Sequence, residues 1–204
     1  MKALLTSLAF AISMRCACAA VIDVDPALTY LMTFEDVTAG VPAGDSVPID
    51  LAALGFSPGD SVRLDSIGSY YYVYGDYGPG GQMAGGMVGV FSSSPTLLGN
   101  DQLNRVLGAI ASGTPATTLN TWIGDYPTDV PQDFFITGGI TLTIPVGAQY
   151  LFVSADDSFF SDNLPGPDGF KLLIEQVPDS CPTIVVAAIS LLGIAVGKPR
   201  FSVR

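Results

Sequence analysis

Four carboxylate or amide side chains lie within eight residues of the chain, between two segments that we expect to be strands. They are Asp156, Asp157, Asp162 and Asn163. Calcium takes about six to eight hard oxygen ligands, from carboxylates, side-chain amides and backbone carbonyls. The spacing predicts a calcium site in which Asp156, Asp162 and Asn163 converge, with a carbonyl of Phe159 or Phe160 turned inward. The alternative is a solvated turn, because Asp and Asn also favour turns through local hydrogen bonds.

Composition removes several other kinds of chemistry. The chain has no histidine, which excludes Ser-His-Asp catalysis and removes a common zinc ligand. Two of its three cysteines, Cys16 and Cys18, lie in the expected leader and the third, Cys181, in the C-terminal tail. We therefore expect no disulfide and no cysteine nucleophile in the central domain. Residues 21–176 hold eighteen acidic and three basic side chains, a net charge of −15, which excludes nucleic acid as a partner.

The elements that position these residues are expected to be short strands separated by Gly and Pro. Ile140, Leu142 and Ile144 alternate with threonines, the clearest period-two pattern in the chain. We predict strands at Leu28–Phe34, Val47–Leu51, Val62–Ser66, Tyr70–Tyr74, Met87–Ser92, Ile140–Ile144, Tyr150–Val153 and Phe170–Glu175. Many short strands of this kind predict an all-β domain, as a β-sandwich or jelly roll.

Two segments depart from the strand pattern. Residues 101–111 carry Leu103, Val106, Leu107 and Ile110 at helical spacing, so we expect one helix there. We interpret Asp125, Asp129 and Asp133 as loop charges, because prolines interrupt any helix in this region. The tyrosines at 70–74 are interpreted as alternating core and surface residues, with stacking on sugar rings as the alternative.

The acidic loop and the strands beside it resemble PA-IL-like galactophilic lectins over residues 48–175. The shared features are the Pro-x-Gly-Ala turn at 145–148, the aromatic-aliphatic strand, the Asp-Asp and Asp-Asn pairs, and Tyr77-Gly78-Pro79. The resemblance implies a galactose-binding-like fold and a calcium ion that contacts sugar hydroxyls. The calcium ligands implied by the resemblance are the side chains of Asp156, Asp162 and Asn163, a carbonyl of Phe159, and a carbonyl of the tyrosine strand at Tyr71. It implies as glycan contacts Asp157, Tyr77 and Gln82.

The chain departs from that family in the sugar pocket. The family uses a histidine and a glutamine from a loop that is shortened here to residues 82–86, and this chain has no histidine. Calcium binding can therefore persist where galactose recognition is lost.

Both termini carry export signals. Residues 1–20 have a basic start, an apolar stretch and small residues near Ala20, the pattern of a signal peptide. Residues 177–204 have a Val-Pro-Asp-Ser motif, an apolar run at 183–197 and a basic end. This tail resembles exosortase-dependent PEP-CTERM sorting signals of the VPDSG type, although Cys181 replaces the usual glycine. The resemblance implies a transmembrane helix, processing by signal peptidase and exosortase, and delivery to the cell surface or extracellular matrix.

Three functions follow from these features. We favour a non-catalytic, calcium-dependent module that binds extracellular polysaccharide or another glycan. A structural surface or biofilm protein without a small-molecule ligand is the alternative. A glycoside hydrolase with two carboxylates is the third, and the size of the domain counts against it.

Overall fold

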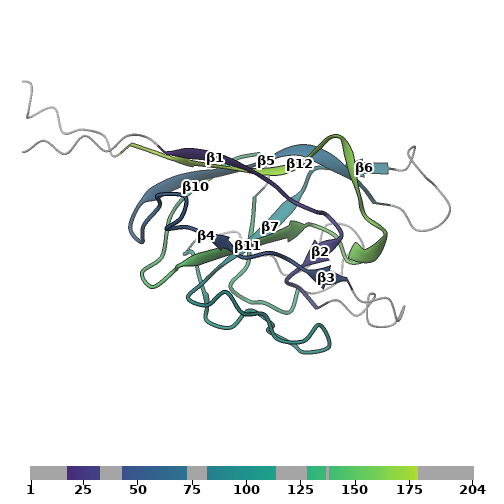
Figure 1. The fold of residues 1–204 in the computed structure, drawn as a ribbon, viewed down its shortest axis with the longest axis horizontal. Coiled ribbons are helices and arrows are strands. Elements are labelled where there is room, and N and C mark those ends of the chain that lie inside the picture. Colours follow the sequence, from purple (N-terminus) through teal and green to yellow (C-terminus); the bar gives the residue numbers. More distant parts are fainter. Residues whose placement is uncertain (1–17, 33–42, 73–81, 114–127, 137, 179–204) are drawn as a thin grey trace, which may run out of the picture.

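The prediction of an all-β protein is confirmed. The computed structural model describes residues 18–32, 43–72, 82–113, 128–136 and 138–178, and these contain strands and one short 3-10 helix but no α-helix. Ten of the strands form two antiparallel five-stranded sheets, which lie as two layers (Figure 1).

The first sheet is built around its two longest strands. Its path runs β1-β12-β5-β10, and β6 pairs with the far end of β5. The strands are β1 (Ala19–Asp23), β5 (Ser61–Tyr72), β6 (Gln82–Ala84), β10 (Ile140–Thr143) and β12 (Leu164–Gln176). The pairing of β12 with β5 shifts register between Pro165 and Phe170. Gly68 and Gly169 meet there with positive φ, and a Cβ on Gly68 would lie 2.1 Å from the Gly169 carbonyl oxygen, so this approach requires glycine.

The second sheet centres on β7 and β11. Its path runs β4-β11-β7-β8, and β9 also pairs with β7. The strands are β4 (Ile49–Asp50), β7 (Met87–Ser92), β8 (Ala109–Ile110), β9 (Phe134–Phe135) and β11 (Tyr150–Ala155). A separate two-stranded parallel pair joins β2 (Leu28–Thr29) to β3 (Gly44–Asp45).

The core follows the alternation of the strands. Val62 and Leu64 of β5 are fully buried, as is Ile144 at the end of β10, whereas Thr141 and Thr143 are exposed, as the period-two pattern predicts. Every residue of β7 is buried, because loops also cover the outer face of the second sheet. The tyrosine strand alternates as expected, with Tyr70 fully buried and Tyr71 partly exposed.

The predicted helix at residues 101–111 is wrong. The segment consists of turns that end in β8, and Asn104 and Gly108 have φ values of 55° and 74°, which no α-helix accommodates. The apolar spacing was misleading, because Leu103 and Leu107 are 61% and 40% exposed while Arg105 between them is fully buried.

Other predictions differ at their boundaries. The strand expected at Leu28–Phe34 is reduced among the described residues to β2, and its last two positions lie outside them. Strand β1 begins at Ala19, inside the segment that we expected to be a leader. The predicted sorting tail beyond Pro178 also lies outside the described residues. Within the described ranges no helix is long and apolar enough to cross a membrane.

Candidate functional site

The acidic loop connects β11 to β12 and is held from two sides. It contains the 3-10 helix Phe160–Asp162 (Figure 1). The Asp156 N–H donates to the Gly86 carbonyl oxygen at 3.1 Å. The Tyr70 hydroxyl donates to the Asp156 carbonyl oxygen at 3.2 Å. The predicted loop and the predicted tyrosine strand are therefore neighbours in the fold.

The polar side chains of this loop are buried. Asp156, Asp157 and Asn163 are each 2% exposed, so these three side chains are not those of a solvated turn. Gly86 makes room for the first of them, because a Cβ there would lie 3.1 Å from Asp156 Cβ and 3.3 Å from its Oδ2. Burying carboxylates is costly unless hydrogen bonds or a cation compensate them.

Asp157 shapes the loop through its own backbone. Its Oδ1 accepts hydrogen bonds from the N–H groups of Ser158 at 2.6 Å and Phe159 at 3.3 Å. Burial raises the pKa of the Asp157 carboxyl to about 7, despite these bonds and a side-chain hydrogen bond from Asn163, and Asp162 adds to the rise. A carboxyl with this pKa is half protonated at neutral pH, so a bound cation would compete with its proton.

Asn163 has the clearest unmet interaction in the loop. Its Nδ2 donates to the Pro26 carbonyl oxygen at 3.2 Å. Its Oδ1 is buried and has no hydrogen-bond partner among the described residues. A buried amide oxygen of this kind is unfavourable unless another group binds it.

The structure adds a buried acidic neighbourhood that the sequence did not indicate. Tyr30 is fully buried, and burial raises the pKa of its hydroxyl well above the usual value, with further contributions from Asp133, Asp156 and Asp129. Asp133 lies in a loop, as interpreted from the sequence, but it is buried there, with an exposed fraction of 1%. Its sequence context, a loop between prolines, gave no signal of this burial.

Asp129 is also more than a loop charge. Its Oδ1 accepts from the Met32 N–H at 2.8 Å and its Oδ2 from the Asn104 N–H at 2.7 Å, so it joins two loops. Burial raises its pKa, and these hydrogen bonds together with Arg105 oppose the rise.

Two further predicted residues, Tyr71 and Gln82, lie on the first sheet beside the loop. Tyr71 is opposite Leu164, the residue after Asn163, and opposite Met83 on its other side. Gln82 is exposed, and its Oε1 accepts a hydrogen bond from the Tyr72 hydroxyl at 2.6 Å. Asp162 and Phe159 are partly exposed members of the loop itself, and Tyr77 lies outside the described residues.

Carboxylates alone do not form a metal centre in the described part of the chain. No three His, Cys, Asp or Glu side chains there are placed to hold a metal ion. A cation in the loop would depend on the Asn163 amide and on backbone carbonyls, which suits calcium better than zinc. Comparison with protein families, curated proteins and solved structures gives no match to this chain.

Proposed function

We propose that this protein is an exported, non-catalytic surface module that binds calcium in the loop at residues 156–163 and, through it, a glycan. The observation that carries the proposal is the buried Oδ1 of Asn163, which has no hydrogen-bond partner among the described residues. It lies in a loop with two buried carboxylates and no basic residue. We assign the two sheets to a jelly roll of the galactose-binding-like type.

The proposed ligands combine side chains with backbone. Asp156, Asp162 and Asn163 contribute side-chain oxygens, and Phe159 contributes a loop carbonyl. The carbonyl of Tyr71 completes the set, since its strand pairs with the residue after Asn163. Hard oxygens of this mixed kind suit calcium, which tolerates irregular geometry. Extracellular calcium, at millimolar concentration, is sufficient for a site of modest affinity.

An exposed row beside the loop supports glycan binding. Met83, Tyr71 and Leu164 occupy matching positions on β6, β5 and β12, and Met83 and Leu164 are 54% and 52% exposed. Aromatic side chains at such surfaces pack against apolar faces of ligands while their polar ends stay hydrated. We propose that a sugar bound to calcium packs on Tyr71, with Gln82 and Tyr77 as polar contacts. Asp157, the third contact expected from the sequence, is 2% exposed, so we propose that it holds the loop in place of touching the sugar.

Thermal unfolding with and without calcium tests the metal site. At a free calcium concentration 100 times Kd, binding adds about 2.7 kcal/mol. This corresponds to a rise in Tm of roughly 5–10 °C for a domain of this size. Asp156→Asn should abolish the rise, whereas Asp168→Asn, an exposed acid outside the loop, should keep it. An equal rise in both variants would contradict the site.

A glycan array with and without EDTA tests the sugar. We expect hits that require calcium and that weaken in Tyr71→Ala while its calcium-dependent Tm rise is kept. Calcium binding without any glycan hit would leave a metal-stabilised surface protein and would reject the lectin-like part of the proposal.

Export is proposed from the termini. Signal peptidase would remove residues 1–20, and exosortase would process the tail after membrane insertion of its apolar segment. Mass spectrometry of the protein purified from the native cell surface or matrix should give a mature chain that ends near Asp179. A chain that retains Arg204 would contradict processing at the motif and indicate a retained anchor.

A further inference from the structure

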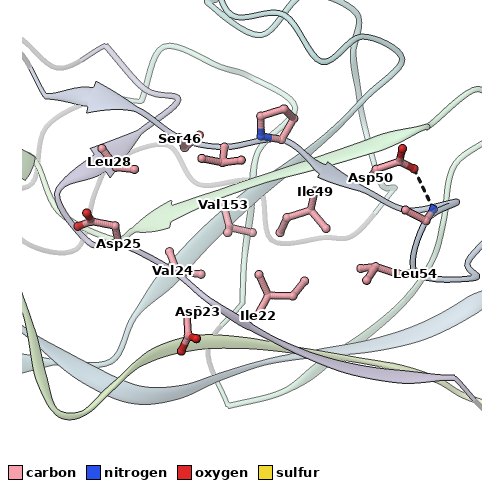
Figure 2. Close-up of a pocket in the computed structure, with 13 residues that line it drawn as sticks. Ile22, Asp23, Val24, Asp25, Leu28, Ser46, Ile49, Asp50, Leu54 and Val153 are labelled. Carbon is pink, nitrogen blue, oxygen red and sulfur yellow. Dashed lines mark hydrogen bonds between the residues drawn. The ribbon is translucent and has the colours of Figure 1, made fainter.

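A pocket of about 440 Å³ lies between the edge strands of the two sheets. It adjoins the acidic loop, because Pro26, between the lining residues Asp25 and Leu28, accepts the hydrogen bond from Asn163. Strand β1 borders it on the first sheet and β4 on the second, and Val153 of β11 forms part of its floor (Figure 2). None of its lining residues belongs to the loop at 156–163. Its volume is within the range of small-molecule sites.

The interior of the pocket is aliphatic. Figure 2 shows Ile22, Ile49, Leu54 and Val153 directed into one space. Together with Val24, Leu28, Val47, Pro48 and Ala53 they make up the apolar lining. Such a surface favours a ligand with an aliphatic body.

One buried serine forms part of the pocket wall. Ser46 is 6% exposed, and its N–H donates to the Thr29 carbonyl oxygen at 3.1 Å, which fixes its backbone. Its hydroxyl is buried and has no hydrogen-bond partner among the described residues, although Ser46 lines the pocket. Because this hydroxyl oxygen is closed off from solvent, a ligand in the pocket does not reach it, and Ser46 contributes only to the wall.

The edge of the pocket is acidic. Asp23, Asp25 and Asp50 surround it (Figure 2). Asp23 pairs with Lys171 at 3.1 Å. Asp25 and Asp50 each use one oxygen to accept a nearby backbone N–H. Three carboxylates against one lysine repel an anionic ligand and attract a cationic one.

We propose that this pocket binds a small aliphatic amine, with the alkyl chain between β1 and β4 and the ammonium group at the acidic edge. The pocket shares no lining residue with the proposed calcium site, although the hydrogen bond from Asn163 to Pro26 joins the two regions.

Methyl NMR of the full-length chain tests the proposal, with octylamine, octanol and octanoate as probes of equal chain length. Octylamine should shift the methyl signals of Ile22, Ile49 and Val153 in a saturable way. Octanoate should bind at least roughly tenfold more weakly than octylamine, because its negative charge faces the same carboxylates. Raising the salt concentration should weaken the binding of octylamine and leave the binding of octanol unchanged.

Two matched variants locate the site. Ala53→Trp places a large side chain in the pocket and should lower the affinity for octylamine roughly tenfold or more. Ala52→Trp changes an exposed neighbour outside the lining and should leave this affinity unchanged. Equal affinity for octanoate, equal loss in both tryptophan variants, or shifts confined to methyls outside the pocket would each overturn the proposal.

Discussion

Buried polar side chains set the properties of the acidic loop at the scale of single residues. The position of the loop was predictable from sequence, because its Asp and Asn residues follow a strongly apolar strand. Their burial was not, since it depends on Pro26, Tyr70 and Gly86, which are distant in the chain. Asp133 shows the same limit, because nothing in its local sequence indicates that it lies near Tyr30.

Asp157 should make the calcium-free protein less stable as pH rises. Its folded pKa of about 7 is above its unfolded value, so the folded state holds a proton that the unfolded state has lost. The free energy of unfolding should therefore fall between about pH 4 and pH 7 and then level off. Urea unfolding at pH 5 and pH 8 in calcium-free buffer measures the difference.

The control for this prediction is Asp157→Asn. This variant should lose most of the difference in the free energy of unfolding between pH 5 and pH 8. Asp168→Asn should keep it, since that side chain is exposed. The same pH dependence in Asp157→Asn would assign it to another group.

Gly86→Ala should weaken calcium binding without unfolding the protein. The added methyl would lie 3.3 Å from Asp156 Oδ2, so the carboxylate must shift by a few tenths of an ångström. We expect a loss of affinity of roughly tenfold, about 1.4 kcal/mol. Gly85→Ala is the matched control, because its methyl would meet the Gly68 carbonyl oxygen at 3.2 Å and not the loop. Equal calcium affinity in both variants would show that Asp156 does not need its present position.

At the scale of elements, sequence periodicity predicted the regular strands and failed at irregular ones. Strands β7, β10 and β11 were predicted closely because each has a clear apolar pattern. The two-residue strands β8 and β9 depend on pairing with β7 and have no pattern of their own. The segment at 101–111 has helical spacing, but its path is determined by buried Arg105 and by positive φ at Asn104.

Arg105 should be a major stabilising residue of these irregular segments. It is fully buried, donates to the carbonyl oxygens of Leu98 and Leu31, and pairs with Asp45. Arg105→Met keeps the aliphatic volume but removes these donors, and should cost about 2–3 kcal/mol. Chemical denaturation measures the loss.

Arg63 offers the comparison on the surface. It pairs with Asp65 and Glu175 but is 41% exposed, so Arg63→Met should cost less than about 1 kcal/mol. A loss as large as that of Arg105→Met would show that burial does not determine the difference.

At the scale of the whole molecule, the acidic loop and the two ends of the described chain lie at opposite ends of β12. Ala19 pairs with Glu175, and the Gln176 N–H donates to the Cys18 carbonyl oxygen at 2.7 Å, so both ends meet (Figure 1). The loop precedes Leu164, which is twelve residues before Gln176 and therefore at most about 40 Å from it at 3.3 Å per residue. A domain tethered through its tail would present the proposed calcium site away from the attachment point.

Isothermal titration calorimetry of calcium tests the central claim most directly. We predict one site per chain, with affinity that rises between pH 6 and pH 8 as Asp157 loses its proton, and no binding in Asn163→Ala. Absence of calcium binding to the wild-type chain at millimolar concentration, or unchanged binding in Asn163→Ala, would contradict the assignment of the loop as a calcium site.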